Sequence, residues 1–237
     1  MMRKSKGFTL IEIAIVLVII GLLLGGVLKG QELITGARVR NLISQQDGVK
    51  AAFFGFQDRY RALPGDYATA ATNINCPSLC VNGDGNGRIE SPNTPGTYED
   101  LVAWSHLTGA GFLNGSFTAT SAVTPASPLD AVAPKNPYSV YMQIVYDGVY
   151  GTGTTAAQGP KKHNVKTGGQ IPVEIIAEVD RKIDDGDPRA GAFQFSSYAP
   201  AAGGFTAPVI GNCVLATLGG GWKLLAGETN CGGASLL

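Results

Sequence analysis

The hydrophobic and polar positions at the start of this chain form one long apolar run. Between Phe8 and Leu28 the only formal charge is Glu12. A run of this length is sufficient to cross a lipid bilayer as a helix. Inside such a helix a carboxylate costs roughly 2.5–3.5 kcal/mol at the centre of the membrane. Glu12 therefore needs a partner that compensates for its charge.

Helical spacing continues beyond the apolar run. Apolar and aromatic residues recur at intervals of seven, four, three and four, which places them on one face of a helix: Leu42, Val49, Phe53, Phe56 and Tyr60. The helix is expected to end at Leu63-Pro64-Gly65, because a residue before proline avoids helical geometry. The pattern predicts one helix from Phe8 to about Ala62, roughly 80 Å long. Its second half should lay its aromatic face on a globular domain.

The rest of the chain reads as short elements separated by loops. Alternating apolar residues predict strands, and apolar residues at helical spacing predict helices. These elements predict an α+β chain, in which a long N-terminal helix is followed by strands, extra helices and loops. We expect loops at 64–98, 116–137 (exposed) and 152–169 (hairpin-like, or a disordered tip). We expect helices at 98–109 and 172–183, and strands at 138–149, 192–198, 212–216 and 222–226.

A family resemblance appears where the apolar run begins. The stretch Lys6-Gly7-Phe8-Thr9-Leu10-Ile11-Glu12 follows a basic leader and resembles the processing site of type IV pilins and type II secretion pseudopilins. The resemblance implies that a prepilin peptidase cuts the Gly7–Phe8 bond and methylates the new amine of Phe8. It also implies that this amine, in a neighbouring subunit, is the partner of Glu12.

Two other interpretations of the N-terminus explain less. A secretory signal peptide would rarely carry Glu12, although Gly25-Gly26 imitates its small-residue cleavage site. A plain membrane anchor accounts for the segment Ile13–Leu28 but not for Gly7-Phe8.

The resemblance implies a domain organisation and a set of partners. Residues 1–7 would be the leader peptide, 8–28 the transmembrane or filament-core half of the helix, 29–62 its amphipathic half, and 63–237 a periplasmic or extracellular globular domain. The fold class would be α+β and pilin-like, with the long helix packed on a small antiparallel sheet with extra helices and loops. The chain would be a structural subunit of a type IV pilus or a type II secretion pseudopilus. Its partners would be prepilin peptidase, related pilin subunits and an inner-membrane assembly platform. The alternative is a minor tip pilin that binds DNA or a surface ligand, which the long loops at 116–137 and 152–169 favour.

The distribution of charged residues predicts the membrane topology and argues against one class of partner. The leader cations Arg3, Lys4 and Lys6 place the N-terminus in the cytoplasm and the domain outside. The expected location is the bacterial inner membrane, as a single-pass protein, and afterwards a periplasmic or extracellular filament. Without the leader, 15 Lys and Arg remain against 18 Asp and Glu, a side-chain charge of −3. This balance argues against a large nucleic-acid-binding surface.

The four cysteines all follow the apolar run, in a compartment expected to be oxidising. Three pairings are possible. We favour disulfides Cys76–Cys80 and Cys213–Cys231. Zinc is the rival, but CPSLC has an unusual ligand spacing, and neither Cys213 nor Cys231 has a neighbouring cysteine or histidine.

The segment from Asn82 to Glu90 is the sharpest local motif outside the helix. Oxygen-bearing side chains alternate along it and resemble part of a calcium-binding loop, with Gly87 and Ile89 in its turn and apolar positions. The first position is Asn rather than Asp and the twelfth is Asn93 rather than Glu, so a glycine-rich turn is the competing interpretation. The predicted calcium ligands are Asn82, Asp84, Asn86 and Glu90.

Other polar groups suggest no catalytic machinery. Asp180, Asp184, Asp185 and Asp187 are expected to end a helix, with a metal site as the alternative. His106 should be packed or at the surface, and Lys161, Lys162, His163 and Lys166 should form a small basic tip in a loop. The sequence has no zinc-protease motif, nucleophile elbow or phosphate loop, so we do not expect an enzyme.

Overall fold

A computed structural model describes residues 10–76, 80–92, 96–152, 159–216 and 220–237. Its contacts divide the chain into two units, Met1–Arg38 and Val39–Leu237. Helix α1 (Leu10–Tyr60) runs from the first unit into the second. The predicted start at Phe8 lies outside the described residues.

The part of α1 that belongs to the second unit is amphipathic, as its spacing predicts. Its buried face includes the predicted Leu42, Val49, Phe53 and Phe56. The helix ends where Arg61 takes a left-handed conformation with φ of 54°. The chain then reverses at Leu63-Pro64-Gly65, as expected from the restriction that proline places on the preceding residue.

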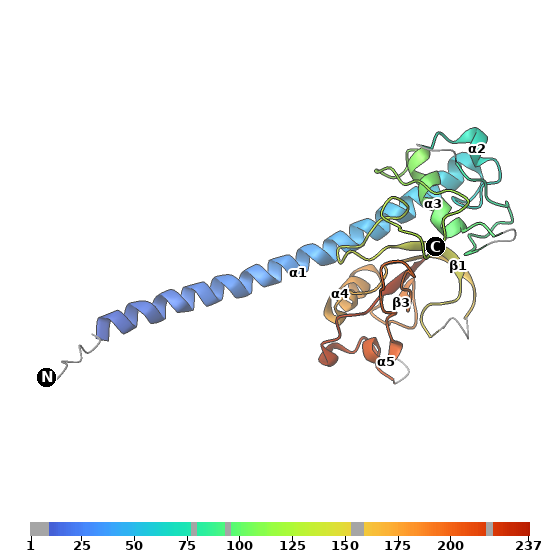
Figure 1. The fold of residues 1–237 in the computed structure, drawn as a ribbon. Coiled ribbons are helices and arrows are strands. Elements are labelled where there is room, and N and C mark those ends of the chain that lie inside the picture. Colours follow the sequence, from blue (N-terminus) through green and yellow to red (C-terminus); the bar gives the residue numbers. More distant parts are fainter. Residues whose placement is uncertain (1–9, 77–79, 93–95, 153–158, 217–219) are drawn as a thin grey trace. The chain divides into compact units, whose positions relative to one another are not determined.

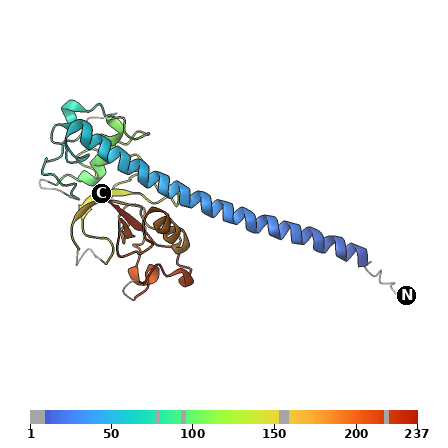
Figure 2. The same ribbon diagram turned by 180° about the vertical axis from the view of Figure 1, so that it is seen from behind.

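The second unit has two apolar cores, each organised around one helix. The first surrounds α3 (Glu99–Gly109) and contains Trp104, Phe56 and Ile89. The second surrounds α4 (Val173–Ile183) and contains Ile176 and Phe193, among others. Figures 1 and 2 show α2 (Ala70–Asn73) and α3 in one part of this unit and α4 and α5 (Ile210–Cys213) in another, with the strands between them.

Four antiparallel strands form the sheet, in the order β1-β2-β4-β3. They are β1 (Gln143–Asp147), β2 (Lys162–Lys166), β3 (Phe193–Phe195) and β4 (Gly233–Leu236). The last strand lies in the middle of the sheet, where Ser235 is opposite Val165 on one side and Phe193 on the other. The arrangement is α+β and pilin-like, as the sequence predicts.

The two predicted helices beyond the first are confirmed. The first is α3, in which the apolar residues are all buried: Leu101, Val102, Trp104 and Leu107. The second is α4, and Pro172 precedes its first residue as the N-cap. Proline suits this position because it has no N–H that the helix would leave without a partner.

Several predicted segments are wrong. Residues 162–166 form β2 rather than part of a loop, because β1 and β4 supply hydrogen-bonding partners on both sides. Residues 212–216 and 222–226 are not strands: α5 and the 3-10 helix η1 (Leu224–Ala226) occupy much of them, and only Val214 and Trp222 form a bridge. The strand β4 was not predicted. Its small residues lack the apolar alternation that marks a strand.

Other segments need smaller corrections. The strand predicted over 138–149 is limited to β1, and that over 192–198 to β3. The segment 116–137 is largely without regular structure, but it is not simply exposed. It packs into the first core through a set of residues that are nearly fully buried: Ala119, Leu129, Val132 and Ala133.

The cysteines pair as the sequence favours. Disulfides join Cys76 to Cys80, with Cα atoms 5.4 Å apart, and Cys213 to Cys231, with Cα atoms 5.8 Å apart. The second bond ties α5 to Cys231, which bridges Ile171, two residues before the start of α4. It therefore links the last part of the chain to the second core.

Candidate functional site

The N-terminal half of α1 is the first functional feature. It contains a window with mean hydropathy 2.8 in which no residue is buried, so the helix is long and apolar enough to cross a membrane. Glu12 lies in its first turn. The predicted cleavage residues Gly7 and Phe8 lie outside the described residues.

The second feature is a clamp on the loop from Asn82 to Glu90, made by two buried carboxylates. Asp66 accepts hydrogen bonds from the backbone N–H groups of Asn86 and Gly87, each at 2.9 Å. Glu99, in the first turn of α3, accepts those of Asp84 and Glu90, each at 3.0 Å. Burial raises the pKa of Asp66 to about 6, and its contact with the Asp84 carboxyl acts in the same direction.

The four predicted calcium ligands do not converge on one point. The Asn82 side-chain oxygen accepts the N–H of Ala71 in α2, at 2.8 Å. Asn86 turns its amide nitrogen toward Asp84 and Glu90, at 3.0 and 3.2 Å. The carboxylates that do approach one another are Asp66, Asp84 and Glu99, with oxygens within 4.8 Å. Backbone or side-chain N–H groups already bind all three, so calcium stays a prediction.

His106 holds the same region from the other side and has a structural role. It is fully buried in α3. Its Nδ1 accepts the N–H of Gly65 at 2.9 Å, and its Nε2 lies 2.7 Å from the carbonyl oxygen of Val81. This geometry fits the neutral ring with its proton on Nε2, and burial lowers the pKa of His106 to about 4. Both ring nitrogens are occupied, which leaves none for proton transfer to a substrate.

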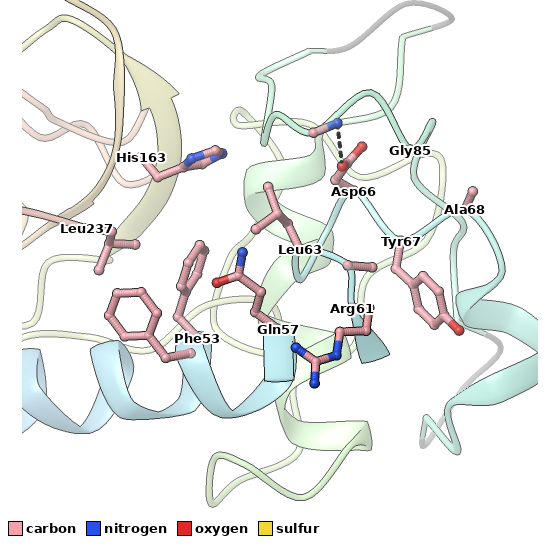
Figure 3. A pocket seen from close by; sticks show the side chains of 13 residues that line it. Phe53, Gln57, Arg61, Leu63, Asp66, Tyr67, Ala68, Gly85, His163 and Leu237 are labelled. Atoms are coloured by element: carbon pink, nitrogen blue, oxygen red, sulfur yellow. Dashed lines mark hydrogen bonds between the residues drawn. The ribbon is translucent and has the colours of Figure 1, made fainter. Parts of the chain in front are cut away.

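A cavity of about 650 Å³ adjoins the clamp, and Figure 3 shows the residues around it. Phe53, Gln57 and Arg61 come from or directly follow α1, whereas His163 comes from β2. Asp66 borders it and binds the loop by the dashed hydrogen bond from the Gly87 N–H. The described lining combines aromatic and aliphatic side chains with the polar groups of Gln57, Arg61 and His163, and it holds no paired nucleophile and base.

The second acidic cluster ends α4, as expected. Asp180 accepts the indole N–H of Trp222 at 2.7 Å, and Asp184 accepts the N–H of Phe193 at 3.0 Å. Asp185 accepts the N–H of Asp187 in a turn, at 2.9 Å. Burial raises the pKa of Asp180 to about 6, and the nearby Asp185 and Asp184 add to the rise.

The predicted basic tip is wrong. Lys161 and Lys162 are exposed, but Lys166 is almost completely buried and forms an ion pair with Asp147. His163 is half-buried beside the aromatic rings of Phe53 and Tyr146. Strand alternation turns His163 to the other face of β2 from Lys162 and Lys166. Lys166 shares a face with Lys162 but is buried against Asp147, so the four side chains do not form one exposed basic patch.

Sequence reasoning missed the structural contacts of four residues: Asp66, Glu99, His106 and Lys166. Asp66 follows the turn Leu63-Pro64-Gly65, and acidic residues are common in the first turn of a helix, where Glu99 lies. These signals could have marked the first two as structural carboxylates. Nothing local to His106 or Lys166 indicates a buried partner, because the partners are remote in sequence.

Comparison with known families gives a match at the N-terminus. Residues 2–28 match the family described as the prokaryotic N-terminal methylation motif. No curated protein and no solved structure matches the chain. The match covers the basic leader, Gly7-Phe8, Glu12 and the apolar run.

The motif and the long apolar helix support the same conclusion. They describe a pilin-like precursor that prepilin peptidase processes, and they indicate a structural subunit rather than an enzyme. This chain therefore carries the signature of type IV pilins and pseudopilins, on an α+β fold of the pilin-like kind.

Proposed function

We propose that this chain is a structural subunit of a type IV pilus or a type II secretion pseudopilus. Prepilin peptidase removes residues 1–7 and methylates the amine of Phe8. The mature subunit stays in the inner membrane, with its globular domain on the periplasmic side, until it is assembled. It then enters a periplasmic or extracellular filament through an assembly platform, with the N-terminal halves of the α1 helices as the filament core.

One observation carries this proposal: the methylation motif over residues 2–28 is continuous with a fully exposed apolar segment of α1. An exposed apolar surface of this size needs lipid or other apolar helices around it. A membrane supplies the first environment, and a bundle of identical helices supplies the second.

Pairing of Glu12 sets the axial position of neighbouring α1 helices in the filament. In lipid its carboxylate is costly, and the methylated amine of Phe8 in a neighbouring subunit offers a cation at short range. A buried ion pair adds little net stability, but it discriminates strongly against positions in which one charge is left unpaired.

The N-terminus of the mature protein tests the proposal. Mass spectrometry of the chain from its native membrane is expected to show a start at methylated Phe8. Gly7→Glu is expected to leave the leader attached. Gly26→Leu, which removes the second small-residue site without adding a charge to the apolar run, is expected to leave cleavage unchanged. A mature start at Met1, or after Gly26, would contradict the proposal.

A further inference from the structure

A buried lysine links the first two strands of the sheet. Lys166 ends β2, and its side chain is 3% exposed. Its ammonium forms an ion pair with Asp147, the last residue of β1, whose side chain is 17% exposed. Asp147 is held in place by the side-chain amide of Asn164 at 3.0 Å and by the N–H of Val149 at 3.2 Å. The two reactive groups are therefore in contact and cannot easily separate.

The surroundings make charge costly at this point. Burial lowers the pKa of Lys166, against the opposing effect of Asp147. Asp100 of α3 is also buried, and burial raises its pKa to about 6. Its carboxyl accepts the side-chain amide of Gln143 at 2.8 Å, and Gln143 is opposite Lys166 in the strand register. The ring of Tyr198 lies 5.7 Å from the Lys166 nitrogen.

A desolvated ion pair of this kind can be replaced by a neutral group. A buried ammonium such as that of Lys166 is expensive even when it is paired with a partly buried carboxylate, whereas an amide carries no net charge. Fixed contact between an amine and a carboxyl also raises their effective concentration far above that of free reactants. Both effects favour condensation over hydrolysis.

We propose that Lys166 and Asp147 form an intramolecular amide bond between their side chains, which joins β1 to β2 covalently. One ammonium proton passes to the Asp147 carboxylate, which gives a neutral amine and a neutral acid. The Lys166 Nζ then attacks Cγ of Asp147, a C–N bond forms and one C–O bond breaks. The departing oxygen leaves as water with a second proton from the amine, so the step needs no oxidant, reductant or activated co-reactant.

The neighbouring surface offers an exit for the water. A cleft of about 480 Å³ borders both Asp147 and Lys166, and Ser197 and Tyr198 line it as well. The bond would hold the edge strand β1 to β2 by a covalent link as well as by backbone hydrogen bonds. This proposal concerns the folded domain and does not depend on the type of filament.

Intact-mass and peptide analysis of the full chain tests the proposal. The linked protein is expected to be lighter by one water than the sequence with its two disulfides. Trypsin should fail to cut after Lys166, and the peptide Asn136–Lys161 should remain joined to His163–Arg181 although Lys161 and Lys162 are cut. A full mass with two separate peptides would overturn the proposal and leave only an ion pair.

Matched variants separate the bond from the fold. Lys166→Arg keeps a cation for Asp147 but should remove the link completely. Asp147→Asn should still form it by releasing ammonia, and its linked product should have the same mass as that of the unaltered chain. Lys162→Met replaces the exposed lysine directly opposite Asp147 in the register and should leave the link unchanged. A link that persists in Lys166→Arg, or that is lost in Lys162→Met, would assign the bond to other residues and overturn the proposal.

Discussion

At the scale of single residues, the packing around Gly65 and Asp66 shows why the chain turns as it does after α1. Gly65 has φ of 92°, and an added Cβ would lie 2.4 Å from the carbonyl oxygen of Glu99. A side chain there would meet both backbone strain and the start of α3. The glycine is therefore required by a close approach between segments as well as by the turn.

Gly65→Ala is expected to destabilise the domain by more than about 3 kcal/mol, because the clash is with rigid backbone. Gly87→Ala is the matched control: its φ is 82°, but an added Cβ would have no atom within 4 Å. It should cost only the conformational strain, about 1–2 kcal/mol. Chemical denaturation of both variants checks this, and equal losses would contradict the role of the close approach.

Asp180 should make the stability of the domain depend on pH. Its pKa is raised from 3.8 to about 6 on folding, so between these values the folded state binds more protons than the unfolded state. Stability from this group is complete below pH 3.8 and is lost as the pH rises through 6. Asp180→Asn should remove this dependence and raise stability at pH 7 by about 1–3 kcal/mol.

Unfolding of both proteins from pH 4 to pH 8 is the measurement. Asp58→Asn, at a carboxylate with 81% of its side chain exposed, is the control and should leave the profile unchanged. A profile for Asp180→Asn parallel to that of the unaltered chain would show that Asp180 does not titrate in this range.

At the scale of elements, α3 holds the loop from Asn82 to Glu90 and the residues around it through hydrogen bonds. Glu99 binds the loop at its first turn, and His106 binds Gly65 and Val81 near its end. These contacts use carboxylate and imidazole groups to satisfy backbone N–H and C=O groups that would otherwise be buried without partners. These contacts attach the loop to the first turn and the last turns of α3.

Calcium binding to the Asn82–Glu90 loop is tested by comparing melting temperatures in millimolar calcium and in chelator. If the ion binds the folded state alone, a hundredfold excess over Kd adds about 2.7 kcal/mol and raises Tm. Asp84→Ala should abolish the difference between the two conditions, while Asp185→Ala should preserve it. Equal Tm values for the unaltered chain would show that hydrogen bonds alone order this loop.

The two disulfides should differ in their contribution to stability. Cys213–Cys231 closes a separation of 18 residues and Cys76–Cys80 one of 4. Chain entropy predicts losses of about 3 and about 2 kcal/mol when each is removed. The double alanine variants, compared by denaturation without reductant, check this. A larger loss for Cys76→Ala/Cys80→Ala would contradict the loop-length argument.

At the scale of the whole molecule, the chain combines two kinds of surface. The N-terminal unit exposes large aliphatic side chains along α1, whereas the second unit buries its apolar residues in two cores. The first surface is suited to lipid or to other copies of the helix. The second is that of a folded domain in water.

Glu12→Val should therefore separate insertion from assembly. The variant removes a charge from the apolar run, so it should enter the membrane at least as well as the unaltered chain. It should enter filaments poorly, because the Phe8 amine of a neighbour would lack its partner. Glu32→Gln, at an exposed position further along α1, should assemble normally. Immunoblots of membrane and sheared-filament fractions measure both steps, and normal filament levels for Glu12→Val would rule out the pairing role.

The elements with a strong local pattern were predictable. The long helix, α3 and α4 follow from apolar spacing, and the processing motif and the resemblance follow from consecutive residues. The cysteine pairing could be favoured because each favoured pair is close in sequence. In each case the information lies within one continuous stretch of the sequence.

What only the tertiary structure decided involves residues far apart along the chain. Strand β4 exists because β2 and β3 bind it on both sides, although its own residues favour no strand. The same holds for the clamp of Asp66 and Glu99 on the loop, and for the ion pair of Lys166 with Asp147. The spacing of apolar residues depends on which face of a segment is buried and which is exposed to water. The sequence by itself therefore determined the helices and the N-terminal motif. Hydrogen bonds and ion pairs between remote segments depend on which backbones meet, and only folding brings them together.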